Sequence, residues 1–242
     1  MSEKYDSIGI NYAELRKPDL RIAKIIDSAL GSAQTVLNVG AGTGNYEPAN
    51  RSVTAVEPSR EMIRKRSPAA AEVIQACAED LPFDDKSFDA SMAILTVHHW
   101  SGKEAGLREM RRVTRGRIVL LTCDPDHRPW LTDYLPELAV LDEKVMPAMS
   151  DYERWLGSVR ITPIPVPHDC SDGFLYAYWR RPAAYLDARI RSGSSAFWTI
   201  SNAEAGLQNL KRELESGEWE RRYAELLTLD AYDAGYRLVV AG

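Results

Sequence analysis

The sequence predicts an α/β protein built on a doubly wound, mostly parallel, seven-stranded sheet. Between residues 35 and 122, short β-branched apolar runs alternate with segments whose apolar residues recur at helical spacing. A glycine-rich turn follows the first apolar run, and another apolar run, 236–240, closes the chain. Alternating strands and helices need crossover connections, which give a parallel sheet with helices on both faces. We therefore expect a single domain over residues 1–242.

The first half of the chain predicts a regular series of elements. Apolar residues at helical spacing between 18 and 30, followed by Gly31, predict a helix within an N-terminal helical cover over 1–31. Helices are also expected at 61–66 and 106–114. Strands are expected at 35–39, 53–56, 73–76, 88–95 and 117–122.

After Cys123 the pattern changes. Residues 124–150 are rich in Pro and Asp, and a short helix at 152–156 precedes a proline-interrupted strand at 159–166, expected at a sheet edge. Residues 173–229 are aromatic-rich and interpreted as mostly helical. We expect them to form a helical substrate lid, inserted before the last strand and covering the carboxyl edge of the sheet.

The composition restricts the class of partner. A net charge of −5 gives no electrostatic footprint for nucleic acid. The three cysteines are far apart and lack metal-ligand spacing, so neither a disulfide framework nor a metal site is expected. No N-terminal signal segment and no apolar run long enough to span a membrane are present. These features predict a soluble, cytoplasmic protein that binds neither nucleic acid nor membranes.

Asn38-Val39-Gly40-Ala41-Gly42-Thr43-Gly44 follows the first expected strand. Glycines at alternate positions let the backbone turn sharply and approach a ligand closely, although such turns also serve purely structural purposes. Glu57 ends the second expected strand at the same crevice, where a carboxylate can accept hydrogen bonds from ribose hydroxyls. The alternative is an exposed strand-end glutamate, which is common on any surface. A nicotinamide cofactor would use the same acid, so Glu57 indicates adenosine without identifying the cofactor.

Further motifs in order along residues 35–122 resemble the class I S-adenosylmethionine-dependent methyltransferases, especially the bacterial small-molecule group. The matching stretches are NVGAGTG, AVEPS, AEDLPFDDKSFDA, ILTVHHW and EMRRVTRGRIVLLT. The resemblance implies a Rossmann-like sheet with its cofactor-binding core at 35–122, the cofactor S-adenosyl-L-methionine and the product S-adenosyl-L-homocysteine.

The resemblance also implies which residues hold each part of the cofactor. The methionine end would lie in the glycine turn, the ribose on Glu57, the adenine near Pro58 and Met62, and the sulfonium above the end of the fourth strand. The remaining implied contacts are Gly40, Ala41, Gly42 and Gly44 in the turn, Ala78 and Glu79 at the polar edge of adenine, and Ala93, Ile94, Leu95 and His98 beside the sulfonium.

The chain departs from the family pattern at two positions. Asn38 replaces an acidic residue that normally helps to hold the amino-acid moiety, and it can still accept a hydrogen bond with less charge. Cys77 stands where many relatives have an aspartate near the adenine amine, and a thiol is a poor acceptor. Neither change removes the pocket.

Tyr12 and Arg16 are four residues apart and would share one helical face. In relatives with a similar Tyr-x-x-x-Arg stretch this helix folds over the cofactor, so Arg16 would pair with the cofactor carboxylate. The alternative is a solvated arginine beside a packed tyrosine.

Methyl transfer from a sulfonium depends mainly on positioning, and a base is needed only for a hydroxyl or a protonated amine. His98 and His99, which end the fourth strand, are candidate bases because histidine titrates near neutral pH. His168 is another, since Asp169 beside it could complete an oriented dyad. The alternative for His98 and His99 is packing or a hydrogen bond to backbone, and the alternative for His168 is a loop-stabilising hydrogen bond.

The aromatic residues of the expected lid predict a partly apolar or aromatic small-molecule acceptor, which we expect to be methylated on oxygen or nitrogen in secondary metabolism. Arg180 and Arg181 could meet an anionic substituent or be ordinary surface charge. Two alternatives remain, a nucleotide-cofactor oxidoreductase and a non-catalytic S-adenosylmethionine-binding protein. The lid aromatics are Phe174, Tyr176, Tyr178, Trp179, Tyr185, Phe197 and Trp198.

Overall fold

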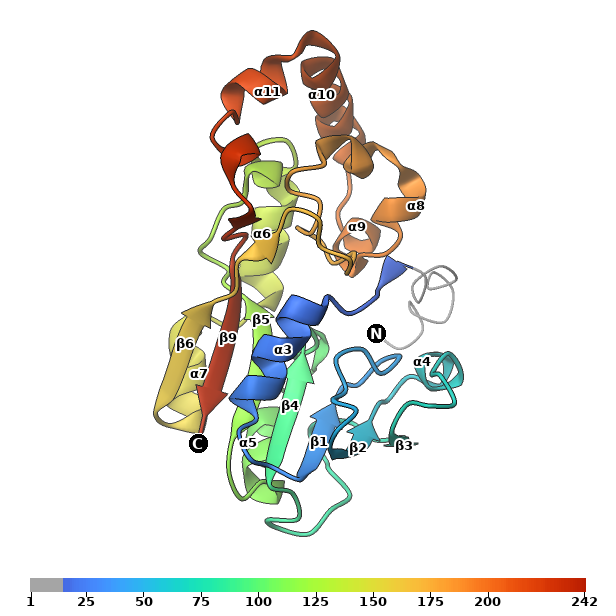
Figure 1. Cartoon of the computed structure of the whole chain (residues 1–242), viewed down its shortest axis with the longest axis vertical. Helices are drawn as coiled ribbons and strands as arrows, with labels where there is room; N and C mark the ends of the chain where they lie inside the picture. The colour runs from blue at the N-terminus through green and yellow to red at the C-terminus, as the bar shows by residue number, and fades with distance from the viewer. Residues whose placement is uncertain (1–14) are drawn as a thin grey trace.

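The computed structural model describes residues 15–242 and has a seven-stranded sheet at its centre, in the order β3-β2-β1-β4-β5-β9-β6 (Figure 1). The first five strands along the chain are parallel, and β9 lies antiparallel to both β5 and β6. The strands are β1 (Thr35–Val39), β2 (Ser52–Val56), β3 (Glu72–Ile74), β4 (Ala90–Ile94), β5 (Ile118–Cys123), β6 (Val159–Pro163) and β9 (Tyr236–Ala241). This arrangement confirms the predicted fold class.

Helices cover both faces of the sheet. The α-helices are α3 (Leu20–Ala29), α4 (Arg60–Arg64), α5 (Lys103–Val113), α6 (Pro136–Val145), α7 (Met149–Leu156), α8 (Ala188–Arg191), α9 (Ser195–Thr199), α10 (Ala203–Ser216) and α11 (Glu218–Arg222). Short 3₁₀ helices are η2 (Val97–His99), η3 (Trp130–Asp133), η4 (Pro182–Leu186) and η5 (Leu226–Thr228). A separate small sheet pairs β7 (Val166–Pro167) with β8 (Ala231–Tyr232).

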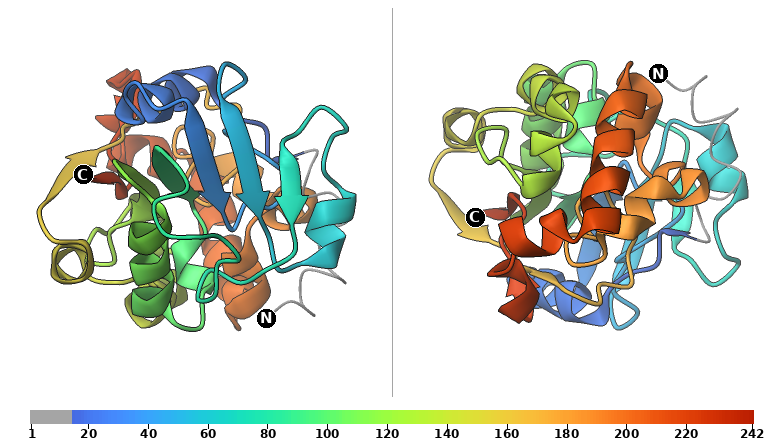
Figure 2. Two further views of the ribbon diagram at one scale, coloured as in Figure 1. Left: turned by 90° about the horizontal axis from the view of Figure 1, so that it is seen from below. Right: turned by 90° about the horizontal axis from the view of Figure 1, so that it is seen from above.

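Successive residues of the central strands point to opposite faces and belong to two cores. Val119 and Leu121 of β5 pack in the cluster that contains Ile22 and Ile26 of α3. The alternating β5 residues Ile118 and Leu120 pack instead with α5 and α7. Figure 2 shows α3 on one side of the sheet and α5 and α7 on the other. Strands buried on both faces explain why the sequence shows continuous apolar runs rather than alternation.

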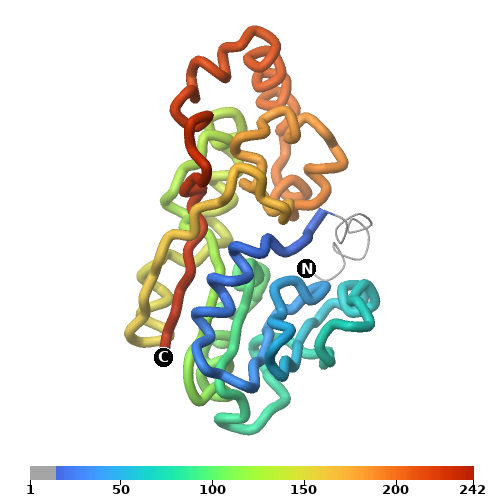
Figure 3. Tube along the Cα trace, in the orientation of Figure 1, coloured from blue at the N-terminus to red at the C-terminus, as the bar shows by residue number. Residues whose placement is uncertain are grey.

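Beyond the carboxyl ends of the parallel strands lie α6 and α8 to α11, and Figure 3 follows the chain from β6 up into this region and back through β9. Its aromatic residues continue the core that lies on the α3 side of the sheet. Trp130 meets Trp219 with ring centroids 5.2 Å apart, and both rings are almost fully buried. Much of the aromatic content of the second half therefore stabilises the helical region itself.

The structure corrects the sequence prediction in three places. Residues 173–187, expected to be mostly helical, contain turns and the 3₁₀ helix η4 but no α-helix. Residues 124–150, for which no helix was expected, contain η3 and α6. The edge strand β6 stops at Pro163, because Val166 and Pro167 pair in the small sheet. The fourth strand ends at Ile94, and Leu95 beyond it has a φ of 53°.

Candidate active site

The glycine turn after β1 depends on its glycines for two different reasons. Gly40 has a φ of 69°, and a Cβ there would lie 2.2 Å from Oγ1 of Thr96. Gly42 has a φ of 52°, but a Cβ there would meet nothing within 4 Å. Gly40 thus allows a close approach between the turn and the segment after β4, whereas Gly42 leaves open space above the turn.

A buried ion pair between Arg66 and Glu47 contacts the glycine turn. Nη2 of Arg66 donates to Oε1 of Glu47 at 2.7 Å, and Nη1 of Arg66 donates to the Gly42 carbonyl at 3.1 Å. The Asn38 amide donates to the same Glu47 oxygen at 3.1 Å. A carboxylate therefore does lie beside Asn38, but Arg66 neutralises its charge.

Glu57 links the turn to the end of β2. One carboxylate oxygen accepts from the Gly42 N–H at 2.8 Å, and the other accepts from the Ser59 N–H at 2.9 Å. Burial raises the pKa of Glu57, and these two hydrogen bonds oppose that rise. Each oxygen keeps acceptor capacity for a ligand hydroxyl.

These groups open onto a first cavity of about 340 Å³, within the range of small-ligand sites. Its glycine floor, the space above Gly42 and the Glu57 carboxylate fit an adenosyl cofactor with a flexible amino-acid tail. The residues lining it that the sequence had indicated as cofactor contacts are Arg16, Asn38, Gly40, Ala41, Gly42, Glu57, Pro58, Met62, Ala78, Glu79, Ile94 and Leu95.

Four expected cofactor contacts do not line this cavity. Gly44 lies further along the turn, Ala93 is fully buried within β4, and His98 lines a neighbouring cavity. Tyr12 lies outside the described residues. The lining residues that sequence reasoning missed are Thr43, Asn45, Tyr46, Ser59, Thr96, Trp100 and Ser101.

At the side of the cavity expected to receive adenine, Glu79 turns towards the loop after η2. Its Oε1 accepts from the Ser101 hydroxyl at 2.9 Å and from the Gly102 N–H at 2.8 Å. Cys77 is exposed and lines the same side. The carboxylate of Glu79 therefore shapes this wall by holding the 101–102 loop.

A second cavity of about 320 Å³ adjoins the first, and Arg16, Leu95 and His99 line both. Leu95 is a non-glycine residue in the left-handed region, a strained conformation that is often found at functional sites. Its backbone N–H donates to the Leu121 carbonyl at 2.8 Å, which holds it against β5. Leu95 thus forms part of the partition between the cavities.

His98 and His99 lie on η2, with ring centroids 3.9 Å apart. Burial lowers the pKa of His98 well below its usual value and lowers the pKa of His99 to about 4, with neighbouring positive charges adding to both shifts. Both rings are therefore neutral at pH 7, so each has a nitrogen that can accept a proton.

His168 does not come to this site. It lines neither cavity, and its Nδ1 lies 3.2 Å from the Asp230 carbonyl. Asp169 instead accepts from Nη1 of Arg21 at 2.7 Å. The expected pairing of His168 with Asp169 as a dyad is absent, because each side chain binds a different segment.

Arg16 is held where the two cavities meet. Its Nε donates to Asp172 at 2.6 Å, and the Tyr46 hydroxyl donates to the other oxygen of Asp172 at 2.8 Å. Asp172 is fully buried. The guanidinium is therefore fixed by an internal carboxylate, and pairing with a cofactor carboxylate stays a prediction.

The helical region contributes fewer aromatic residues to the site than the sequence suggested. Phe174, Tyr176 and Trp198 line the second cavity. Arg180 donates to the Leu229 carbonyl, and Arg181 donates to the carbonyls of Cys170 and Ala177, so both arginines have structural roles. Tyr178, Trp179, Tyr185 and Phe197 line neither cavity.

Over residues 15–242, no group of three or more His, Cys, Asp or Glu side chains is placed to hold a metal ion. None of the helices in that range is long and apolar enough to cross a membrane.

Comparisons with known proteins agree with this site. A family model described as a methyltransferase domain matches residues 37–120. A solved structure from Anabaena variabilis, provisionally described as a methyltransferase from an antibiotic biosynthesis pathway, is 38% identical. The two superpose with a TM-score of 0.85 over 94% of this chain and 99% of that one.

Two curated relatives extend the comparison. YcgJ of Bacillus subtilis, described as an uncharacterized methyltransferase, is 35% identical over 46% of this chain, and the match spans only 45% of that relative. The demethylmenaquinone methyltransferase of Paenarthrobacter aurescens is 28% identical over 84% of this chain and 83% of its own length. Together with the sheet order and the glycine turn, these matches show that the chain belongs to the class I S-adenosylmethionine-dependent methyltransferases.

Proposed function

We propose that this chain binds S-adenosylmethionine in the first cavity and transfers its methyl group to oxygen or nitrogen of a small, partly apolar molecule in the second. One observation carries the proposal: the two cavities meet at Arg16, Leu95 and His99. Two ligands that fill them would meet beside these three residues. That arrangement suits a direct transfer between cofactor and acceptor.

When bound, the cofactor supplies a methyl group already activated by sulfonium. The acceptor would supply the lone pair that takes up this methyl group, the demethylated cofactor would leave as a neutral thioether, and an acceptor X–H would have to release its proton. The protein's main contribution is to hold both ligands in line, an effect that contributes roughly 7–11 kcal/mol. Glu57 and the glycine turn would fix one ligand, and the walls of the second cavity the other.

The chain's histidines can assist the proton's departure. His98 and His99 line the second cavity, and their lowered pKa values keep both rings neutral at pH 7. A neutral ring can accept a proton, although the pKa of about 4 makes His99 a weak base. Positioning is therefore expected to matter more than base catalysis.

The relatives support a small-molecule acceptor. One is named for demethylmenaquinone, and another is assigned to an antibiotic biosynthesis pathway. The second cavity has apolar walls, which include Phe174, Trp198 and Tyr236. A partly apolar acceptor is consistent with both observations.

The first test is cofactor binding. Isothermal calorimetry and thermal-shift measurements should show binding and stabilisation by S-adenosylhomocysteine and none by NAD. Absence of heat with folded protein, or stabilisation by NAD alone, would remove the proposal and favour an oxidoreductase.

The second test is turnover. Incubation with methyl-labelled cofactor and small-molecule extracts should transfer label to one acceptor, and analysis of the product should place the methyl on oxygen or nitrogen. Label on carbon would correct the atom type. Cofactor binding without any labelled product would favour a non-catalytic binding protein.

A further inference from the structure

Asp142 is a buried carboxylate that the reaction described so far does not use. It lies on α6 with 5% of its surface exposed, and it lines the second cavity. The other buried residue of α6 is Leu138, one helical turn earlier, so Asp142 lies on the buried face of the helix. Burying a carboxylate in such a position is costly unless a partner compensates its charge.

The described residues compensate Asp142 only in part. The Tyr176 hydroxyl donates to Oδ2 of Asp142 at 3.0 Å. Over residues 15–242 no lysine, arginine or histidine forms a salt bridge with it, and the nearby Arg128 pairs with Glu143. Burial consequently raises the pKa of Asp142 to about 6. At pH 7 the group is mostly charged and keeps acceptor capacity.

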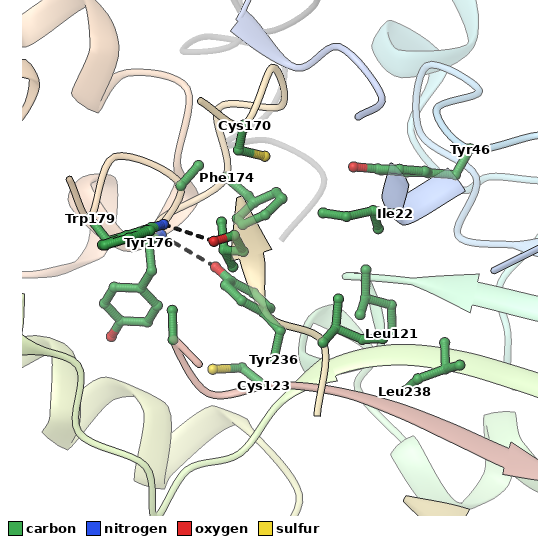
Figure 4. Packing of buried hydrophobic residues seen from close by; sticks show 14 of the residues in the cluster. Ile22, Tyr46, Leu121, Cys123, Cys170, Phe174, Tyr176, Trp179, Tyr236 and Leu238 are labelled. Atoms are coloured by element: carbon green, nitrogen blue, oxygen red, sulfur yellow. Dashed lines mark hydrogen bonds between the residues drawn. The ribbon is translucent and has the colours of Figure 1, made fainter. Parts of the chain in front are cut away.

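Tyr176 is itself held in place. Its backbone N–H donates to the Tyr236 hydroxyl at 3.3 Å, and Figure 4 shows this bond beside the packed side chains of Cys123 and Phe174. All four of these residues line the second cavity. The Asp142–Tyr176 pair therefore stands in a rigid, mostly apolar wall.

The other ionisable groups that line the second cavity determine which charges surround Asp142. His98 and His99 are neutral at pH 7, and the buried Cys123 thiol has a raised pKa because of its burial. Lys144 and Arg16 also line the cavity, and the Arg16 charge is offset by Asp172. Asp142 is the only carboxylate on the wall of this cavity within residues 15–242.

We propose that Asp142, oriented by Tyr176, anchors the methyl acceptor through a hydrogen-bond-donating amine or hydroxyl group on an apolar or aromatic skeleton. This inference rests on the proposed function and names the substrate class for the same site. A protonated amine fits best, because it offsets the buried charge as well as donating. A carboxylate on the acceptor would be repelled.

The test uses three fragments that share one skeleton: phenylethylamine, phenylethanol and phenylacetate. The full-length protein is first saturated with S-adenosylhomocysteine, and fragment affinity is then measured by ligand-observed NMR at pH 7.5. We expect the amine to bind most tightly, the alcohol more weakly and the carboxylate least.

Two variants and a matched control assign the preference to Asp142. Asp142→Asn should weaken amine binding by roughly tenfold or more, since hydrogen bonds to charged groups are among the strong ones. Tyr176→Phe keeps the ring and should weaken binding by a smaller factor. Glu143→Gln removes the same charge from the exposed face of the same helix and should leave affinity unchanged.

Several outcomes would overturn the inference. They are failure of the amine to bind, binding of phenylacetate as tight as that of the amine, and unchanged amine affinity in Asp142→Asn. If the wild-type protein did not bind S-adenosylhomocysteine at all, that result would instead contradict the proposed function. Failure of the inference and failure of the proposed function are therefore distinguishable. Normal cofactor binding by Asp142→Asn shows that a weakened fragment affinity does not come from misfolding.

Discussion

The two cavities adjoin each other but are built in different ways. The first includes a backbone turn, with Gly40 and Gly42 at positive φ and Glu57 bonded to it. The second is formed by side chains from segments far apart in sequence, including Leu95, Asp142, Tyr176 and Tyr236. Backbone geometry requires particular residues at fixed spacing, whereas a side-chain wall can change one residue at a time. The first cavity therefore carries the family's features, and under the proposed function the second would set what this member accepts.

The largest effect is expected at the first cavity, from Gly40→Ala. A methyl group at this position would clash with Thr96 and would force alanine into the left-handed region. We expect a loss of roughly 2–5 kcal/mol of stability and no measurable cofactor binding. Thermal unfolding and calorimetry with S-adenosylhomocysteine measure the two effects.

Gly42→Ala is the matched control, because it adds the same methyl group at positive φ in open space. It should cost less stability than Gly40→Ala. Removing the clashing side chain, in Gly40→Ala combined with Thr96→Ala, should restore part of the loss. Equal damage from the two glycine variants would show that backbone conformation alone, and not the approach of Thr96, sets the turn.

The next largest effect is expected from Glu57→Gln. An amide oxygen can replace only one of the two acceptors that hold the Gly42 and Ser59 N–H groups. We expect affinity for S-adenosylhomocysteine to fall roughly 10- to 100-fold, while amine binding in the second cavity changes less. Calorimetry with each ligand checks the difference. An equal loss of affinity for both ligands would contradict the proposal that the two cavities bind different ligands.

Asp142→Asn should stabilise the ligand-free protein at neutral pH. The folded pKa of Asp142, about 6, lies above its ordinary value of 3.8, so the wild-type protein loses stability as pH rises through that interval. The variant avoids this loss and should gain up to about 3 kcal/mol at pH 8, a difference that disappears towards pH 4. Urea unfolding at both pH values measures it, with Glu143→Gln as control. A destabilised variant at pH 8 would assign Asp142 a structural role.

The smallest effect is expected from His168→Ala. His168 lies outside both cavities and contacts the Asp230 carbonyl. We expect kcat and KM to stay within about twofold and stability to fall by about 1 kcal/mol or less. If His168 were the general base, its removal would lower kcat roughly 10²- to 10⁴-fold. A steady-state assay that found such a loss would show that His168 takes part in catalysis.

The difference between the cavities also explains what the sequence could predict. Strands β1 to β5 and the glycine turn were predicted because apolar runs and glycine spacing are local signals. Asp142 was missed because its hydrogen-bond partner Tyr176 lies 34 residues away. One local sign was available: an acidic residue one helical turn after Leu138, on the same side of the helix.

The helical region at 173–229 was predicted less well for a related reason. The aromatic residues at 174–185 suggested helix, yet this stretch makes turns because its rings pack against distant partners. Phe174, for example, meets Tyr236 with ring centroids 4.6 Å apart. Similarly, the sequence placed His168 beside Asp169 but could not show that Arg21 takes the carboxylate. Adjacent residues in a chain need not share a site.

Asp172 links residues that border both cavities. It accepts hydrogen bonds from Arg16 and from the hydroxyl of Tyr46, a residue of the loop that follows the glycine turn, and it lies two residues before Phe174. If ligand binding displaced that loop, Asp172 would pass the displacement to the segment that carries Tyr176. By thermodynamic linkage, any gain in acceptor affinity on cofactor binding must be matched by an equal gain in cofactor affinity on acceptor binding. If the same coupling held between the methylated product and the demethylated cofactor, departure of the product would weaken binding of the demethylated cofactor.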